Sequence, residues 1–299
     1  MQNKLYLECF SGISGDMTVA ALLDLGADQI GLLQVLENLP VQGFNTKIQR
    51  IKKSGLDCLD FDVILDKEHQ NHDHDMAYLY NYTNKQNYND AHINERPNIH
   101  HHEHNKHHHE HTNTDHHEHN KHHHEHRCFN EIKEIISNST LTENAKHIAI
   151  RIFEIIAHAE AKAHGESFDE VHFHEVGAVD SIVDIISVAY CIDNLEIDEV
   201  IVPYLCEGHG NVRCQHGILP IPVPAVSNIV TAHQISLKLI NIDGELVTPT
   251  GAAIVAALRT TDKLPEIFTI DKIGLGAGKR DYGLSGILRA MLITSSERE

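Results

Sequence analysis

The pattern of hydrophobic and polar positions predicts ordered structure in two parts of the chain, separated by a long segment in which every period stops. In the first part, LYLECF alternates as a strand does, and apolar residues then recur at helical spacing. Two later strands flank a turn at Ser54-Gly55. The predicted elements are a strand at 4–9, helices at 17–25 and 30–39, and strands at 47–51 and 58–65.

A long amphipathic helix at 142–164 dominates the second part, because its apolar residues from Ala145 to Ala163 step by three or four positions. Thr248 and Pro249 fit the N-cap and first position of a later helix. The remaining predicted elements are a strand at 171–174, a helix at 180–195, a strand at 199–205, a helix at 248–258, and strands at 267–273 and 286–293. This mixture predicts an α+β (mixed α/β) fold.

The central segment lacks the apolar residues that a core requires, so we expect it to be disordered. Its sequence HHEHNKHHHEH occurs twice, at 101–111 and 116–126, and fifteen of the 27 histidines lie within 100–126. We therefore predict a two-lobed core interrupted by a disordered His-rich insert. The expected parts are a first α/β part at 1–67, the insert at 68–128, and the main α/β part at 129–299.

The histidine tract indicates metal binding, because imidazole binds nickel, copper, zinc and iron, and the glutamates among the histidines add oxygen ligands. Many weakly held ions suit storage or delivery, whereas a catalytic ion needs a fixed geometry. The alternative is a non-functional origin, since replication slippage duplicates polar repeats inside tolerated loops. Under both interpretations we expect the chemistry of the protein in its folded part.

Composition excludes several classes of partner. The net charge of −19, with histidine neutral, argues against nucleic acid and against an anionic membrane. We find no apolar run long enough to span a bilayer, and the first residues do not resemble a signal peptide. The six cysteines lack the spacing of a disulfide framework, which favours reduced thiols and a cytoplasmic protein.

The segment HFHEVGAVDSIVD contains the densest set of potential metal ligands in the folded part. In a strand, His172 and His174 point to the same face, and Glu175 follows directly. Asp180 then lies at a helix N-terminus, with Asp184 one turn further on the same side. Two imidazoles and up to three carboxylates predict a divalent-metal site. The competing interpretation is that Asp180 caps its helix while the histidines form hydrogen bonds within the fold.

A second cluster of potential ligands follows in CEGHGNVRCQHG, and its members are Cys206, His209, Cys214 and His216. Their spacing is loosely zinc-like but matches no common zinc-finger pattern. Because cysteine is often simply a small buried residue, His216 alone is the better candidate for a functional role.

Two glycine-containing loops suit an anionic ligand. SGISGDM lies between a strand and a helix, where free N–H groups and the helix dipole favour phosphate. TPTGAA opens a later helix in the same way. The candidate binding residues of these loops are Ser14, Gly15, Thr248, Thr250 and Gly251.

A third loop, GLGAGKR, adds the cations Lys279 and Arg280, although it has neither the spacing nor the Ser/Thr of a Walker A loop. Asp16 in the first loop has two interpretations, as a metal ligand or as an acidic complement to the helix dipole. Together the three loops favour an anionic small molecule as the ligand.

The order of these motifs resembles one family. SGISGDM with LLDLGA behind it, VHFHEVGAVDSIVDI, CQHGILPIPVPA, GELVTPTGAA and GLGAGKRD are similar to the LarC nickel-insertion family, from Cys9 to about Arg289 and without the insert. The resemblance implies insertion of nickel into pyridinium-3,5-bisthiocarboxylic acid mononucleotide, with CTP as a required nucleotide accompanied by Mg²⁺ or Mn²⁺. The product is the nickel-pincer cofactor that activates lactate racemase and similar enzymes. The histidine tract then becomes a nickel reservoir.

The resemblance also assigns functional residues. The matched motif positions are Asp16, His172, His174, Glu175, Asp180, Asp184 and His216. We expect nickel to be held by the first four of these. As the nickel–carbon bond forms, the pyridinium ring carbon loses a proton, which we expect Asp180, Asp184 or His216 to accept. The glycine loops, with Lys279 and Arg280, would hold the phosphate of the substrate.

Full-length members of this family continue into a further C-terminal domain associated with nucleotide and metal binding. We therefore expect the present chain to act with a separate C-terminal LarC polypeptide and to serve a nickel-pincer-dependent enzyme such as lactate racemase; homo-oligomerisation stays open. The alternative function is that of a nickel storage or delivery metallochaperone without catalysis of its own. A metal-dependent hydrolase is a third reading, but it explains only the histidine–carboxylate cluster.

Overall fold

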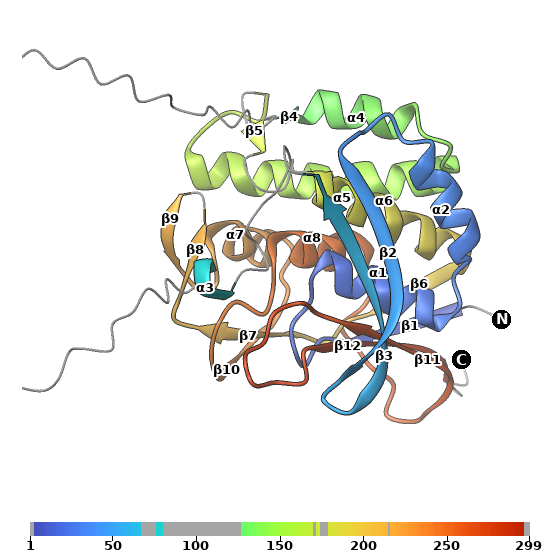
Figure 1. The fold of residues 1–299 in the computed structure, drawn as a ribbon. Coiled ribbons are helices and arrows are strands. Elements are labelled where there is room, and N and C mark those ends of the chain that lie inside the picture. Colours follow the sequence, from blue (N-terminus) through green and yellow to red (C-terminus); the bar gives the residue numbers. More distant parts are fainter. Residues whose placement is uncertain are drawn as a thin grey trace, which may run out of the picture.

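The computed structural model describes residues 3–66, 76–79, 127–169, 172–173, 179–214 and 216–295. Within these residues the architecture is a six-stranded mixed sheet with helices packed against it (Figure 1). The mixed α/β class expected from the sequence is confirmed. Of the insert expected at 68–128, the described residues include only α3 (Met76–Leu79) and β4 (Arg127–Cys128).

The sheet combines strands from both folded parts of the chain, in the order β2-β3-β11-β12-β1-β6. The pairs β3–β11 and β1–β6 are parallel, and the other neighbours are antiparallel. The strands are β1 (Asn3–Glu8), β2 (Phe44–Lys53), β3 (Leu56–Leu65), β6 (Ile197–Ile201), β11 (Phe268–Ala277) and β12 (Ile287–Ser295).

The strand expected at 199–205 is wrong at its C-terminal end. β6 stops at Ile201, and a separate strand, β7, begins only at Leu205. Pro203 lies between them, and proline cannot donate a backbone hydrogen bond to a strand ladder. The chain therefore leaves the large sheet here and pairs elsewhere.

The helices form layers above the sheet (Figure 1). Helix α1 lies directly on the strands and contacts α6, while α5, α7 and α8 contact one another farther from the sheet. Thr142 caps α5 through a hydrogen bond from the Ala145 N–H, and Gly165 ends that helix in the left-handed conformation. The helices are α1 (Gly15–Leu25), α2 (Gln29–Glu37), α4 (Phe129–Ser137), α5 (Glu143–His164), α6 (Val179–Asn194), α7 (Pro224–Ala232) and α8 (Pro249–Leu258).

Short strands complete the structure at its periphery. β7 pairs with β10 in parallel, β4 pairs with β5, and β8 and β9 form an antiparallel hairpin. These additional strands are β5 (His172–Phe173), β7 (Leu205–His209), β8 (Asn211–Cys214), β9 (Gly217–Pro220) and β10 (Leu237–Asp243).

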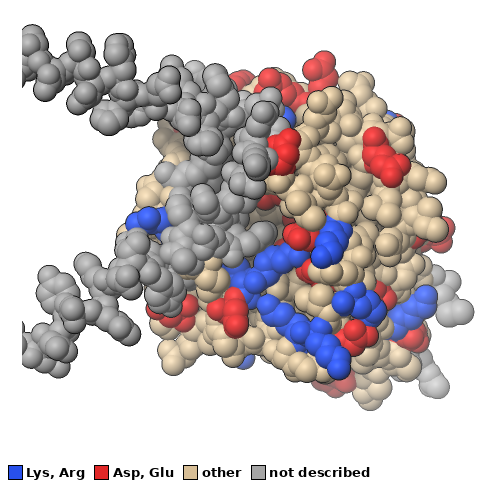
Figure 2. Space-filling model, in the orientation of Figure 1, with Lys and Arg blue, Asp and Glu red and all other residues tan. Residues whose placement is uncertain are grey.

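One large hydrophobic cluster joins the sheet to both helix layers, with members as far apart in sequence as Leu5 and Ala290. On the face drawn in Figure 2, Lys and Arg gather over the lower half, with Asp and Glu among them. Ion pairs such as that of Arg50 with Asp24 show how surface charges of opposite sign are matched. No helix in the described ranges combines the length and apolarity that crossing a bilayer requires.

Helix α1 approaches β11 closely enough for the two backbones to touch. A Cβ atom at Gly276 would lie 2.0 Å from the carbonyl oxygen of Met17, and one at Gly274 would lie 2.1 Å from that of Ala21. No real Cβ atom tolerates such distances, so glycine is required at both positions. This contact fixes the start of α1 over the end of β11, next to the site described below.

The substitution Gly276→Ala should destabilise the fold by about 1–3 kcal/mol, because the added methyl group pushes α1 away from β11. Urea unfolding measures the effect. Thr269→Ala, on the exposed part of the same strand, is the control and should change stability by less than about 0.5 kcal/mol. Equal stabilities for the two variants would contradict the backbone contact.

Candidate functional site

Four helices of the described chain begin at the wall of one cavity of about 380 Å³. The cavity is lined by residues from the first turns or N-caps of α1, α6, α7 and α8, among them Ser14, Asp180, Pro224 and Thr248. Each helix start carries N–H groups without intrahelical partners and a partial positive charge. Their convergence makes the cavity attractive to anions.

The starts of α1 and α8 are held together by backbone hydrogen bonds. The Ile13 N–H donates to the Leu246 carbonyl at 3.0 Å, and the Thr248 N–H donates to the Ile13 carbonyl at 3.1 Å. The Thr248 hydroxyl then accepts from the Gly251 N–H and caps α8. The motifs SGISGDM and GELVTPTGAA thus form one rigid wall of the cavity.

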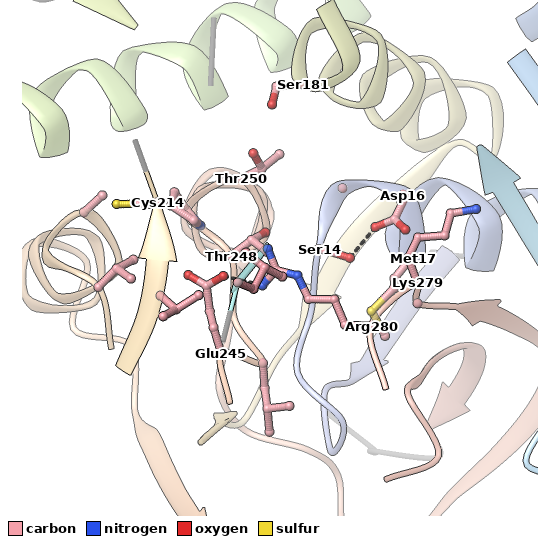
Figure 3. Close-up of a pocket in the computed structure, with 18 of the residues that line it drawn as sticks. Ser14, Asp16, Met17, Ser181, Cys214, Glu245, Thr248, Thr250, Lys279 and Arg280 are labelled. Atoms are coloured by element: carbon pink, nitrogen blue, oxygen red, sulfur yellow. Dashed lines mark hydrogen bonds and ion pairs between the residues drawn. The ribbon is translucent and has the colours of Figure 1, made fainter. Parts of the chain in front are cut away.

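Three carboxylates, those of Asp16, Asp180 and Asp184, line this wall, and we call them the acidic group. The Ser14 hydroxyl donates to Asp16 Oδ1 (Figure 3), and the Asp16 backbone N–H donates to the Asp184 carboxylate. A Cβ atom at Gly15 would lie 2.4 Å from Asp184 Oδ2, so glycine is what lets this carboxylate approach α1.

Asp16 Oδ2 and Asp184 Oδ1 are buried and accept no hydrogen bond from the described residues. Burial, followed by the charges of Asp16 and Asp180, raises the pKa of Asp184 well above its ordinary value, while Lys279 opposes the shift. A carboxylate with a raised pKa binds a proton more strongly than an ordinary aspartate. The acidic group is therefore suited to accept a proton.

The two cations of the third glycine loop also face the cavity, and each has an acidic partner. Lys279 Nζ lies 2.5 Å from Asp60 Oδ1 and 3.4 Å from Asp62 Oδ1. Burial lowers the pKa of Lys279, but Asp60, Asp62 and Asp16 outweigh that effect and the net pKa is raised. Arg280 forms an ion pair with Glu245. Both side chains are therefore charged and firmly placed.

The backbone of this loop is anchored by a residue from the edge strand β2. Lys53, the last residue of β2, donates from Nζ to the Gly278 carbonyl at 2.7 Å and to the Arg280 carbonyl at 3.2 Å. An incoming phosphate would meet cations that are already oriented. It would also compete with Asp60 and Glu245 for them.

The side of the cavity opposite the acidic group has different chemistry (Figure 3). Glu160 and His164 come from the last turn of α5, and Cys214 and His216 come from the β8–β9 hairpin. Cys214 Sγ lies 3.9 Å from His216 Nδ1, and the rings of His164 and His216 have centroids 4.7 Å apart. We call these four residues the sulfur–imidazole cluster.

The zinc-like quartet considered from the sequence is not assembled. Cys206 is buried in β7, and the ring of His209 is hydrogen-bonded to Asn241. In the ranges that the structure describes, no three His, Cys, Asp or Glu residues are positioned to hold a metal ion as they stand. Cys214 and His216 instead lie beside α5.

The structure brings most of the candidate residues to one place. Those that line the cavity are Ser14, Gly15, Asp16, Asp180, Asp184, His216, Thr248, Thr250, Lys279 and Arg280. Gly251 lies behind it, with its Cα facing the Ile13 carbonyl. His174 and Glu175 lie outside the described residues, and His172 is described only as part of the β5 backbone.

Sequence reasoning missed the acidic partners of the cations and the α5 side of the cavity. Asp60 and Asp62 alternate in β3, so their common face was readable from the sequence, but their partner was not. Glu160 and His164 are four residues apart in α5, so the sequence also indicated that they share one face of the helix. Glu245 lies within a quoted motif and was overlooked among its apolar neighbours.

A further buried carboxylate, that of Glu207, supports the cavity wall from behind. Its Oε1 accepts hydrogen bonds from the N–H groups of Gly208, Leu246 and Val247. Burial raises the pKa of Glu207 to about 7, and these three N–H groups only partly oppose the shift. Glu207 thereby fixes the segment that connects Glu245 to the start of α8.

The family described as nickel insertion protein matches residues 5–299. The chain belongs to this family. Among relatives, a pyridinium-3,5-bisthiocarboxylic acid mononucleotide nickel insertion protein of Alkaliphilus metalliredigens is 48% identical over 98% of the chain. Proteins of the same name from Clostridium acetobutylicum and Acetivibrio thermocellus are 44% and 36% identical over 96% and 99% of the chain.

This nickel insertion family member spans 61% to 63% of the length of these relatives. No solved structure matches it. The resemblance to LarC proteins that the motifs indicated is confirmed. The cavity described above is where several of those motifs meet in this chain.

For Glu207 we expect a stability effect that depends on pH. A carboxyl group whose folded-state pKa is raised stabilises the fold below its ordinary pKa of 4.5, and this contribution disappears as the pH rises through about 7. The shift corresponds to about 3 kcal/mol. Glu207→Gln should therefore gain stability relative to the unsubstituted protein between about pH 5 and pH 8, measured by urea unfolding. A stability difference between the two proteins that stays constant with pH would contradict the raised pKa of Glu207.

The variant Asp184→Asn should melt at a higher temperature than the unsubstituted protein at about pH 8, by roughly 2–4 °C. The amide carries no charge, so it removes the repulsion from Asp16 and Asp180. The gain should shrink toward about pH 4, where the carboxyl group of the native protein is protonated. Asp262→Asn makes the same chemical change at an exposed position and should show no such gain.

Proposed function

We propose that this chain inserts nickel into pyridinium-3,5-bisthiocarboxylic acid mononucleotide and that the reaction takes place in the cavity. One observation carries the proposal: a single cavity combines four helix N-termini with an acidic group whose member Asp184 has a raised pKa. The first feature suits an anionic mononucleotide, and the second suits loss of a proton from it. The names of the relatives supply the substrate.

Substrate binding follows from size and charge. A cavity of about 380 Å³ lies within the range found for small-molecule sites. The phosphate and both thiocarboxylates of the substrate are anionic, and each helix start contributes roughly 0.3–1 kcal/mol toward a nearby anion. Lys279 and Arg280 add full positive charges to the lining of the same cavity. We assign the phosphate to this region.

The acidic group would take up the proton that the reaction releases. When nickel bonds to the pyridinium ring carbon, the electron pair of the C–H bond becomes the nickel–carbon bond and the proton leaves. Asp184 is the preferred acceptor because burial and two neighbouring carboxylates raise its pKa. The negative charges of Asp16 and Asp180 destabilise the ionised form of Asp184, and this favours the protonated form.

Several parts of the proposal rest on the family resemblance. These are the requirement for CTP with Mg²⁺ or Mn²⁺, the need for a separate C-terminal polypeptide, and the supply of cofactor to an enzyme such as lactate racemase. The assignment of Asp16, His172, His174 and Glu175 as nickel ligands is also a prediction from their motifs. Asp16 lines the cavity, and the other three lie in the chain shortly before α6, which begins at the cavity wall.

A reconstitution tests the proposal. The full chain is mixed with Ni(II), CTP, Mg²⁺ and the bisthiocarboxylate mononucleotide, with and without a polypeptide covering the remainder of the Alkaliphilus relative. Mass spectrometry detects the nickel-containing product, and activation of apo lactate racemase confirms it. Product in either mixture supports insertion. Nickel binding without product in both mixtures would overturn insertion in favour of nickel storage.

Asp184→Asn should lower kcat in this assay by about 100-fold or more, because an amide cannot accept the proton. KM should change little, since the helix starts and the cations stay in place. The same variant is expected to be more stable than the native protein, so a lost rate cannot be blamed on unfolding. Asp262→Asn is the control with unchanged kcat, and an unaffected kcat in Asp184→Asn would remove this residue from the reaction.

A further inference from the structure

We infer that the sulfur–imidazole cluster is the docking site of the nickel ion, on the side of the cavity opposite the acidic group. Cys214 and His216 are its principal ligands, with His164 as a third and Glu160 beside it. The inference rests on the proposed function and adds to it the place where the metal substrate waits. From the sequence, Cys214 was considered only as part of a loosely zinc-like quartet, and His216 was expected as a proton acceptor. Glu160 and His164 were not singled out.

The four side chains form a continuous series of contacts. Glu160 Oε2 lies 3.5 Å from His164 Nε2, the His164 and His216 rings lie 4.7 Å apart, and His216 Nδ1 lies 3.9 Å from Cys214 Sγ. Ligands of one metal ion with bonds of about 2.0–2.3 Å lie roughly 3–4 Å from one another. Neighbouring donors in this series are therefore close to the spacing of shared ligands, and side-chain rotation would complete the site, because no three of the described donors hold an ion as they stand.

The backbone favours a cation at this side of the cavity. Glu160 and His164 belong to the last turn of α5, a helix of 22 residues, and the C-terminal end of a helix carries a partial negative charge. The opposite wall is built from helix N-termini, which carry the reverse polarity. The field inside the cavity thus directs a metal cation toward α5 and an anionic substrate toward α1 and α8.

The donor types match nickel and its destination. Imidazole suits nickel, and thiolate is a soft ligand of the same kind as the sulfur atoms of the substrate. Because the described residues offer no preformed set of three ligands, the ion would be held incompletely. Incomplete coordination leaves positions open for the two substrate sulfurs, so nickel passes from protein sulfur and nitrogen to substrate sulfur without being released.

Cys214 is distinguished from most other cysteines of the chain by its exposure. Cys9, Cys58, Cys191 and Cys206 are buried, and burial raises the pKa of each of these thiols. Cys214 is only partly buried and lines the cavity, so nickel reaches its sulfur. On binding, the Cys214 thiol gives its proton to solvent and the thiolate electron pair forms the nickel–sulfur bond.

The test uses the full chain and Ni(II) alone, without substrate or CTP. The histidine tract binds nickel as well, but residues 67–126 contain no cysteine. Nickel bound to the tract therefore does not contribute to the near-ultraviolet sulfur-to-nickel charge-transfer absorption. With nickel in excess, the unsubstituted protein should show this absorption, and Cys214→Ser should lose it. Cys128→Ser, which alters the other partly exposed cysteine, should keep it.

Substitution of an imidazole extends the test. His216→Gln should raise the apparent nickel dissociation constant read from this absorption by about tenfold or more. His209→Gln, which removes an exposed imidazole bonded to Asn241 outside the cavity, should leave it unchanged. Absence of the band from the unsubstituted protein, its persistence in Cys214→Ser, its loss in Cys128→Ser, or equal constants for both histidine variants would each overturn the docking site.

This result is independent of the reconstitution. A missing charge-transfer band together with a functioning insertion assay would remove the sulfur–imidazole cluster and leave the proposed reaction intact. A band that follows Cys214, with no product in the assay, would keep the cluster as a nickel site and remove the reaction.

Discussion

The convergence of four of the described helix starts on one cavity is the constraint on which the rest of the site depends. It supplies N–H groups and positive potential in an enclosed space, and it draws in acidic first-turn residues such as Asp16 and Asp180. Burial raises the pKa of Asp184, and the crowding of these carboxylates beside it adds to the shift. The same helix starts that make the cavity attractive to anions therefore also gather the acidic group.

Close backbone contacts make this arrangement rigid. Glycines at 15, 274 and 276 let α1 touch α6 and β11, and hydrogen bonds through Ile13 tie α1 to the start of α8. Glu207 and Lys53 then hold the two loops that carry Glu245 and Arg280. Since each wall is anchored at the backbone, charges of both signs keep fixed positions around the cavity.

The sequence predicted features that depend on neighbouring residues, but not contacts between residues far apart in the chain. The α8 helix and its Thr248 cap were predicted correctly because capping is a local signal, and the motifs identified the family. The pairing of Lys279 with Asp60 spans 219 residues and left no trace in either segment. The same holds for the meeting of α5 with the β8–β9 hairpin. Pro203 was a local signal for the end of a strand, but the prediction did not use it and placed one strand at 199–205 where β6 and β7 are separate.

The order of strands has a consequence for how the protein is made. β1 pairs with β12 through partners as distant as Lys4 and Ile293, and β3 pairs with β11. During synthesis, β1 therefore cannot pair with β12 until almost all of the described residues have left the ribosome. The loop of Lys279 and Arg280 joins the cavity only at that point. The histidine-rich segment at 100–126 leaves the ribosome long before, so its imidazoles are synthesised ahead of the loop that completes the cavity.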